Sequence, residues 1–278
     1  MDIIAGSYYI INDQIYNCSL VNFLFNNLDY QVYEVLRTSN KIPVFLSDHL
    51  VRLKESLILL DISDHFNEKF AIRIISKLLE SNSVYEGNIK FLFRYNNGKS
   101  GYASYFIPNY YPTKKDYKEG VKLLTYPITR IDPQIKQVFV NEYIRKEIET
   151  IKLINSVYEV LLINEIGCIT EGSKSNFFLI KDNILYSAPE EWILKGITRK
   201  YILEICTQNK LKYKETIIKK SELNKYDAAF ICGTSPKILP AKEIDSILFD
   251  VNHPLIEFFK EKYDIVLLNQ IKRSSNTY

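Results

Sequence analysis

The first feature of this sequence that could do chemistry is a carboxylate surrounded by small polar residues. In the segment 169–176 (ITEGSKSN), Glu171 precedes two serine hydroxyls and an amide, and the segment leads directly into an apolar stretch. At the entrance of a strand, such a segment can present one negative charge and several hydrogen-bond donors to one bound molecule. A polar β-turn has the same composition, so the segment alone leaves both interpretations open.

Two further segments have the composition of an anion site. Residues 196–198 (GIT) begin a predicted helix, where unpaired backbone N–H groups and a hydroxyl meet the positive end of the helix dipole, an arrangement suited to phosphate. Residues 233–235 (GTS) follow a predicted strand and form a turn that can supply further N–H and O–H donors. An ordinary helix start and an ordinary strand-end turn look the same, so neither segment assigns a function by itself.

Strands and helices must position these segments, and the sequence predicts both. Leucines recur at helical spacing over 48–60, where Ser47 or Asp48 is the expected N-cap. A turn at 96–98 (NNG) joins two strands as a hairpin. The predicted strands are 8–15, 30–38, 88–95, 102–107, 121–126, 160–164, 177–180 and 228–232, and the other predicted helices are 67–80, 140–155, 197–208 and 254–268.

The order of these elements predicts an α+β fold with two domains. A length of 278 residues fits about two domains, and the mixed order of strands and helices argues against a regular βαβ winding. The segment 108–116, with two prolines and a short charge run, is the expected interdomain linker. We therefore predict a smaller N-terminal α/β domain at 1–107 and a larger domain at 117–278.

Composition excludes several classes of function. The chain has 36 basic and 33 acidic residues, and the resulting charge of +3 is too small and too scattered to indicate nucleic-acid binding. Its four cysteines form no CxxC pair and its three histidines form no HExxH motif, so we expect no metal site. No apolar run approaches 18 residues, so we expect no membrane span and a cytoplasmic location.

Six segments, taken together and in this order, resemble the fold type IV pyridoxal-phosphate enzymes. That family includes the branched-chain and D-amino-acid aminotransferases and aminodeoxychorismate lyase. The resemblance implies a D-amino-acid-aminotransferase-like fold whose larger C-terminal domain carries a barrel-like mixed sheet, a pyridoxal 5'-phosphate cofactor, and a homodimer. The segments are 33–37 (YEVLR), 48–53 (DHLVRL), 158–162 (YEVLL), 170–176 (TEGSKSN), 194–199 (LKGITR) and 233–236 (GTSP).

The resemblance also implies the reactive groups. Lys136 matches the lysine that forms the internal aldimine, and burial with nearby positive charge is expected to lower its pKa. Glu171 matches the glutamate that keeps the pyridine nitrogen protonated, so that the ring can accept electrons from a substrate carbanion. The freed lysine amine would then move a proton between the substrate and the cofactor, in a ping-pong cycle.

Other residues match the cofactor-binding positions of the family. Arg52 matches the arginine that binds the cofactor phosphate, although the residue pattern also fits a solvated charge on a helix. Ile197, Thr198 and Thr234 match the phosphate-binding positions. Leu194 matches the apolar wall against the pyridine ring.

Substrate choice is less constrained. Tyr33 and Arg37 would share one face of a strand, and they are the expected substrate-binding residues together with Ser235. The strand around 90–95 has no histidine, so the Arg-x-His pair of D-amino-acid aminotransferases is absent, and Arg37 favours an L-amino acid. We expect an aminotransferase acting on a branched-chain or aliphatic amino acid and a 2-oxo acid. An aminodeoxychorismate lyase and a non-catalytic scaffold of the same fold are the alternatives.

Overall fold

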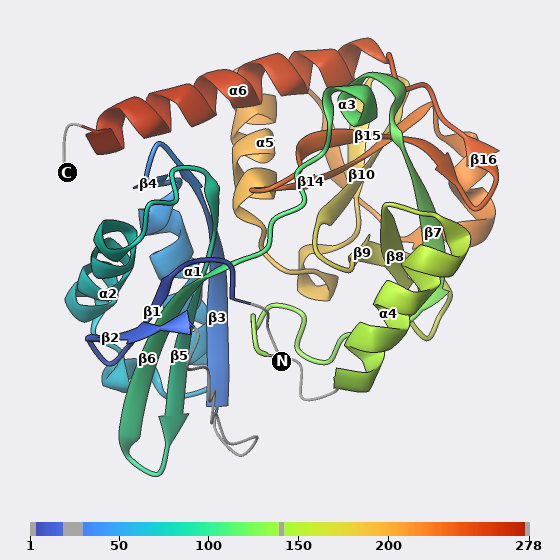
Figure 1. Ribbon diagram of the computed structural model, residues 1–278. Helices are drawn as coiled ribbons and strands as arrows, with labels where there is room; N and C mark the ends of the chain where they lie inside the picture. The colour runs from blue at the N-terminus through green and yellow to red at the C-terminus, as the bar shows by residue number, and fades with distance from the viewer. Residues whose placement is uncertain (1–3, 19–29, 139–141, 276–278) are drawn as a thin grey trace. The chain divides into compact units, whose positions relative to one another are not determined.

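The computed structural model describes residues 4–18, 30–138 and 142–275, which form two compact units (Figure 1). The first unit is drawn from residues 1–110, 135–140 and 269–278, and the second from 111–134 and 141–268. Residues 140 and 141 of the predicted helix 140–155 lie outside the described residues. Within the segment 108–116, residues 114–116 already belong to a helix.

The first unit is built on a six-stranded antiparallel sheet in the order β2-β1-β6-β5-β3-β4. The predicted hairpin is confirmed, with Asn97 and Gly98 in the left-handed conformation at its turn. The predicted strand 8–15 is instead two strands, because Asn12 and Asp13 both have positive φ and turn the chain back. The strands are β1 Tyr8–Ile11, β2 Gln14–Asn17, β3 Tyr30–Ser39, β4 Ile42–Pro43, β5 Gly87–Asn96 and β6 Lys99–Ile107.

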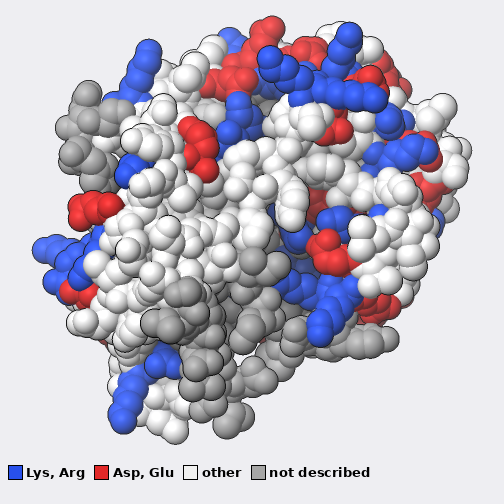
Figure 2. Space-filling view, viewed as in Figure 1, with Lys and Arg blue, Asp and Glu red and all other residues white. Residues whose placement is uncertain are grey.

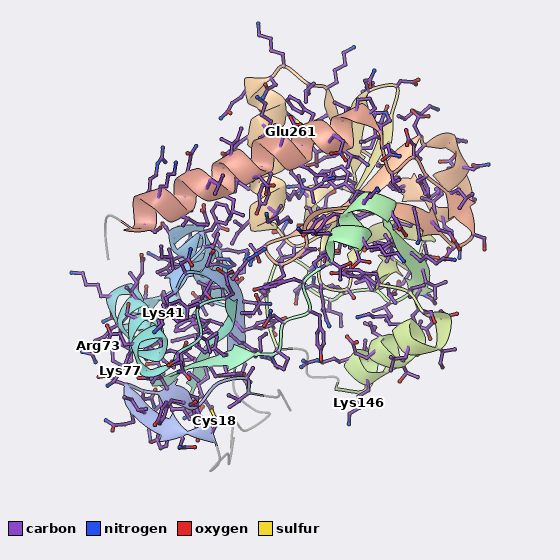
Figure 3. All side chains as sticks on the ribbon, turned by 45° about the horizontal axis from the view of Figure 1, so that its top comes forward. Cys18, Lys41, Arg73, Lys77, Lys146 and Glu261 are labelled. Carbon is purple, nitrogen blue, oxygen red and sulfur yellow. The ribbon has the colours of Figure 1, made fainter. Side chains whose placement is uncertain are left out.

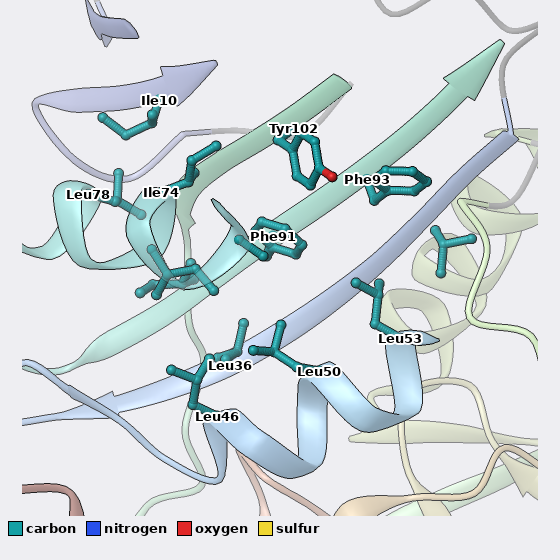
Figure 4. Packing of buried hydrophobic residues seen from close by; sticks show 14 of the residues in the cluster. Ile10, Leu36, Leu46, Leu50, Leu53, Ile74, Leu78, Phe91, Phe93 and Tyr102 are labelled. Atoms are coloured by element: carbon teal, nitrogen blue, oxygen red, sulfur yellow. The ribbon is translucent and has the colours of Figure 1, made fainter. Parts of the chain in front are cut away.

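Two helices, α1 (Leu46–Leu59) and α2 (Glu68–Ser81), cover one face of this sheet, with a short 3-10 turn η2 (Ser63–His65) between them. Their leucines and isoleucines pack on alternate residues of β3 and β5, as Figure 4 shows for Leu50 and Leu36. Burying one such side chain contributes about 1.5–3 kcal/mol to folding. This packing fixes α1 against β3, and both elements carry residues of the site.

The predicted N-cap of α1 is wrong. The helix begins at Leu46, with Phe45 as its N-cap in the left-handed conformation and without a side-chain cap. Phe45 is completely buried, and the gain from burying its ring favours a helix start at this point. In α2, by contrast, the side chain of Asn67 caps the helix by accepting a hydrogen bond from the backbone N–H of Phe70.

The second unit contains a ten-stranded mixed sheet in the order β12-β11-β10-β14-β15-β7-β8-β9-β13, with β16 paired to β15. Strand β7 pairs in parallel with both β8 and β15, whereas β8 and β9 are antiparallel. The strands are β7 Val121–Pro127, β8 Glu159–Ile163, β9 Cys168–Gly172, β10 Asn176–Lys181, β11 Ile184–Ser187, β12 Tyr213–Glu215, β13 Ile218–Lys219, β14 Ala228–Gly233, β15 Lys237–Ile244 and β16 Ile247–Leu248.

Side chains on alternate positions of these strands form the core of the second unit. Phe177 and Leu179 of β10 point to the same side as Ile231 of β14. On the other side, Phe230 stacks on Phe178 with ring centroids 5.2 Å apart. The helices are α3 Lys114–Glu119, α4 Glu142–Asn155, α5 Ile197–Gln208 and α6 Pro254–Ser275, with 3-10 turns η3 Glu190–Trp192 and η4 Lys220–Lys225. The last turns of α6, from residue 269, are counted with the first unit.

Charged side chains of both signs are interspersed on the molecular surface. Figure 2 shows basic and acidic groups side by side on one face. On α2, Arg73 and Lys77, labelled in Figure 3, both pair with Asp13. Such mixing fits the small net charge of +3. None of the helices in the described part of the chain is long and apolar enough to cross a lipid bilayer.

Candidate active site

The backbone of Lys136 is fixed in the first unit. Residues 136–138 run along the free edge of β3, where Tyr33 N–H donates to the Lys136 carbonyl (3.0 Å) and Val138 N–H donates to the Gln31 carbonyl (2.9 Å). The Lys136 N–H donates to the hydroxyl of Ser56 in α1 (3.3 Å). A sheet edge and a packed helix therefore place this lysine, although it lies about a hundred residues from β3 in the sequence.

The side chain of Lys136 lies beside an aromatic ring that contacts a second lysine. Its Nζ is 5.4 Å from the centroid of the Tyr33 ring, and Lys90 Nζ is 4.7 Å from the same centroid. Lys90 is buried, with 6% of its surface exposed. The sequence analysis did not identify Lys90, and the available signal was a single lysine within the apolar run of β5. Tyr33 thus has cation–π contacts with two ammonium groups.

Glu34, next to Tyr33 in β3, points to the opposite face of the sheet and binds two residues of α1. Arg52 donates from Nε to Oε1 (2.8 Å) and from Nη2 to Oε2 (2.5 Å). His49 Nδ1 lies 2.7 Å from Oε2. Burial favours the neutral acid, but the charges of Arg52 and Lys136 and the hydrogen bonds from His49 and Arg52 outweigh it and hold the pKa of Glu34 well below its usual range.

His49 is held neutral in this cluster. Burial, assisted by the charges of Arg52 and Lys136, lowers its pKa, while the contact with Glu34 acts in the opposite direction. Because ionised Glu34 can only accept hydrogen bonds, we assign the imidazole proton to Nδ1. Nε2 is then an acceptor, and it is buried without a hydrogen-bond partner among the described residues.

The position of Arg52 excludes one of the two interpretations of its sequence pattern, the solvated helix charge. Its side chain is 9% exposed and forms a two-point ion pair with Glu34, so it is not a solvated helix charge. A planar guanidinium held in one orientation is suited to bind a phosphate, which is the role that the family resemblance implies.

Glu171 lies in the second unit, in β9, a strand that the sequence analysis missed. Arg130 Nη1 donates to its Oε1 (2.6 Å), and Oε2 accepts from Asn176 Nδ2 (3.2 Å) and from the backbone N–H of Leu194 (3.1 Å). The carboxylate is almost completely buried, with 3% of its side chain exposed. Three donors therefore fix both of its oxygens.

Asn176 connects this carboxylate to the start of α5. Its Nδ2 also donates to the Leu194 carbonyl (2.9 Å), and a Cβ added to Gly196 would come within 1.8 Å of its Oδ1. Gly196 is the N-cap of α5 and has no side-chain cap, so the first N–H groups of the helix are presented at this point. Glycine is required here because the amide of Asn176 occupies the space of a side chain.

The third predicted segment lies at the same end of the sheet. Thr234 and Ser235 stand in the turn between β14 and β15, two and three residues after Cys232, which pairs with Asn176. On α5, the hydroxyl of Thr198 is 3.0 Å from that of Tyr263 in α6, and both residues are buried. The three polar segments found in the sequence thus converge within the second unit.

Comparison with known proteins identifies the family. The model of the family described as amino-transferase class IV matches residues 31–244. The chain belongs to the class IV aminotransferase family. This assignment confirms the family predicted from the six segments.

Similar proteins and solved structures support this assignment. A D-alanine aminotransferase of Bacillus licheniformis is 28% identical over 236 residues, which cover 77% of this chain and 78% of that protein. The crystal structure of a "putative 4-amino-4-deoxychorismate lyase" of Legionella pneumophila has a TM-score of 0.73 and 26% identity, covering 87% of this chain and 91% of the other. A branched-chain aminotransferase of Thermobaculum terrenum has a TM-score of 0.80 at 20% identity, covering 98% and 97%. These likenesses confirm the predicted fold.

The residues of this class IV enzyme fit the cofactor that its family uses. Pyridoxal 5'-phosphate has a phosphate, a ring nitrogen and an aldehyde. The uncapped start of α5 provides N–H donors for a phosphate, and the buried carboxylate of Glu171, bound by Arg130, suits a protonated ring nitrogen. Lys136 provides a primary amine, which is the group that bonds to an aldehyde.

Proposed function

We propose that this protein is a pyridoxal 5'-phosphate-dependent aminotransferase that moves an amino group between an amino acid and a 2-oxo acid by a ping-pong mechanism. The observation that carries the proposal is the convergence of Glu171, Asn176 and the start of α5 within the second unit. A buried carboxylate and a helix N-terminus joined by one amide are suited to bind the ring nitrogen and the phosphate of one cofactor. When bound, this cofactor withdraws electrons from the α-carbon of an amino acid.

Different residues bind the phosphate and the ring of the cofactor. Ile197 and Thr198, with N–H groups in the first turn of α5, bind the phosphate together with Thr234 and Arg52. Leu194 packs against the ring, and its N–H orients Glu171.

Lys136 and Glu171 carry out the chemistry. The amine of Lys136 would hold the cofactor by its aldehyde, and as a general base and acid it would take up the proton of the substrate α-carbon and return it. Its backbone is fixed by Tyr33 and Ser56, so its amine works from a defined point. The carboxylate of Glu171 would hold the ring nitrogen in its protonated form.

The outer face of β3 is our proposed substrate face. Tyr33 and Arg37 share it, and Lys90 of β5 lies on the same face because it pairs with Val35. Tyr33 supplies an apolar contact and Arg37 binds the substrate carboxylate. The face lacks a histidine, so we propose L-amino acids with branched or aliphatic side chains as substrates. We also propose that the enzyme is a cytoplasmic homodimer.

The test begins with the purified protein and added pyridoxal 5'-phosphate. We expect a yellow species that borohydride bleaches, with the reduced cofactor located on Lys136 by peptide mapping. The K136A variant should show neither the colour nor the label. The matched control is K146A, a change at an exposed lysine of α4 (labelled in Figure 3), which should retain both. Colourless protein that takes up no cofactor would contradict the proposal and favour a non-catalytic scaffold.

A panel of amino donors with 2-oxoglutarate then tests the reaction. An aminotransferase forms glutamate, and we expect the highest rates with L-leucine, L-isoleucine or L-valine. Glutamate from D-alanine alone would contradict the proposed substrate class. The similarity to the Legionella pneumophila structure favours a second candidate function, that of a lyase. Release of pyruvate from 4-amino-4-deoxychorismate without glutamate formation would establish that alternative.

A further inference from the structure

We infer that Arg130 is a positioning residue that keeps Glu171 anionic and oriented toward the cofactor's ring nitrogen. The inference rests on the proposed function and concerns a residue that none of the six family-like segments contains. Arg130 follows β7 by three residues, and Glu171 lies in β9, two strands away across β8. The arginine side chain therefore spans the end of β8 to reach the carboxylate.

The contact has the features of a strong charge-assisted hydrogen bond. Arg130 Nη1 and Glu171 Oε1 are 2.6 Å apart, and the two side chains are 14% and 3% exposed. Hydrogen bonds between two charged groups are roughly twice as strong as those between neutral groups. The other two donors, Asn176 Nδ2 and Leu194 N–H, are neutral amides. Arg130 is therefore the group among these three that brings positive charge to the buried carboxylate.

Removing that charge would change what Glu171 can do. A buried carboxyl group without a nearby cation favours its neutral form, because burial penalises the ionised form. A neutral carboxylic acid does not stabilise a protonated pyridine nitrogen. Arg130 thus acts on the cofactor through Glu171, and its loss should affect the contact to the ring nitrogen specifically.

A salt bridge that merely stabilises the fold would produce a different pattern of binding. The distinguishing probe is 1-deazapyridoxal 5'-phosphate, in which a C–H group replaces the ring nitrogen. We would measure the dissociation constants of the natural cofactor and of this analogue by quenching of tyrosine and tryptophan fluorescence. Their ratio isolates the ring-nitrogen contact, because the phosphate and aldehyde are identical in both.

We expect the wild type to prefer the natural cofactor by about tenfold or more, since hydrogen bonds to charged groups are worth about 1.5–3 kcal/mol. E171A should bind both molecules equally. R130M should lose most of the preference, and R130K, which keeps a charge without the fork, should keep part of it. The control K122M removes an exposed ion pair with Glu243 in the same unit and should leave the ratio unchanged.

Several results would overturn the inference about Arg130. If R130M binds both molecules more weakly but with the wild-type ratio, Arg130 is only structural and the inference is wrong. If R130M does not fold, the ratio for R130K decides in the same way, with a wild-type value overturning the inference. If the wild type binds neither molecule, the proposed function fails and the role of Arg130 fails with it. If both the wild type and E171A prefer the natural cofactor over the analogue, the ring nitrogen does not contact Glu171 and the inference is wrong.

Discussion

Glu34 of β3 and Arg52 of α1 form a buried two-point ion pair, with Nε 2.8 Å from Oε1 and Nη2 2.5 Å from Oε2. The pair fixes the plane of the guanidinium that we propose for phosphate binding. A lysine at this position would keep the charge but could not be held in one plane by two parallel hydrogen bonds. Glu34 therefore helps to orient the guanidinium of Arg52 toward a bound anion.

Changing Glu34 to Gln should destabilise the protein by about 3–5 kcal/mol, because it leaves the buried charge of Arg52 without its counter-charge. The free energy of unfolding, measured by chemical denaturation, checks this. Changing both residues, in E34Q/R52M, should recover part of the loss. The control R73K alters an ion pair with Asp13 in which Arg73 is 60% exposed, and should change stability by less than about 1 kcal/mol. Equal losses in E34Q and R73K would contradict the role of the pair.

The neutral state of His49 predicts a pH dependence of folding. Its pKa is lowered in the folded protein, so the unfolded chain takes up the proton first as the pH falls below about 6.5. The stability from neutral His49 is therefore complete above about pH 6.5 and is lost as the pH falls toward the folded-state pKa. The loss has an upper limit of about 1.4 kcal/mol per pH unit.

The variant H49N isolates this contribution. The asparagine amide can replace the Nδ1–H donor to Glu34 but does not titrate, so its stability should fall less than that of the wild type between pH 7 and pH 5.5. Denaturation midpoints at both pH values measure the difference. H65N, at an exposed histidine stacked on Tyr95, is the control and should follow the wild type. If H49N and the wild type lose stability equally, His49 is not the titrating group.

The parts of the site that the sequence predicted are those whose chemistry is local. Glu171, the start of α5 and the turn after β14 each lie in a short polar segment where small residues and a helix or strand boundary coincide. Turn and cap chemistry leave such patterns in a few consecutive residues. Their convergence was inferred from a family resemblance, and the pairing of Asn176 with Cys232 explains it.

The residues that the sequence did not reveal depend on distant partners. Arg130 contacts a residue 41 positions later, and the single lysine in the apolar run of β5, Lys90, does not by itself indicate the contact with Tyr33. The strand β9 was missed because Thr170, Glu171 and a glycine give it a polar composition although it is buried. In both cases tertiary contacts override the local pattern, and one sequence contains no record of those contacts.

Changing Glu171 to Gln should impair proton abstraction more than cofactor binding. An amide has one acceptor oxygen, but donors approach both carboxylate oxygens, Arg130 on one side and Asn176 and Leu194 on the other. Either orientation of the glutamine therefore directs its NH₂ group at a donor.

The rate of α-proton exchange into D₂O, followed by NMR, should fall by about 100-fold or more in E171Q, the scale of losing one stabilising contact in a transition state. The dissociation constant of pyridoxal 5'-phosphate should change less. An exchange rate equal to that of the wild type would show that this carboxylate does not support the cofactor.

Gly196 and Asn176 should behave as one unit, because a Cβ at position 196 would lie 1.8 Å from Asn176 Oδ1. The φ of Gly196 is −68°, so its backbone accepts alanine and the conflict is with the amide alone. G196A should therefore displace Asn176 and remove its hydrogen bonds to Glu171 and to the Leu194 carbonyl, at a cost of about 1–3 kcal/mol in the free energy of unfolding.

A double-mutant cycle tests this coupling. N176A should weaken folding and cofactor binding about as much as G196A does. Adding G196A to N176A should then cost only the preference of the helix N-cap for glycine over alanine, about 0.5–1 kcal/mol in the free energy of unfolding. Denaturation and cofactor titration of the two single variants and the double variant give the coupling energy. Fully additive losses would mean that Gly196 is required for another reason, such as direct approach of the phosphate to the backbone, and that Asn176 does not explain the glycine.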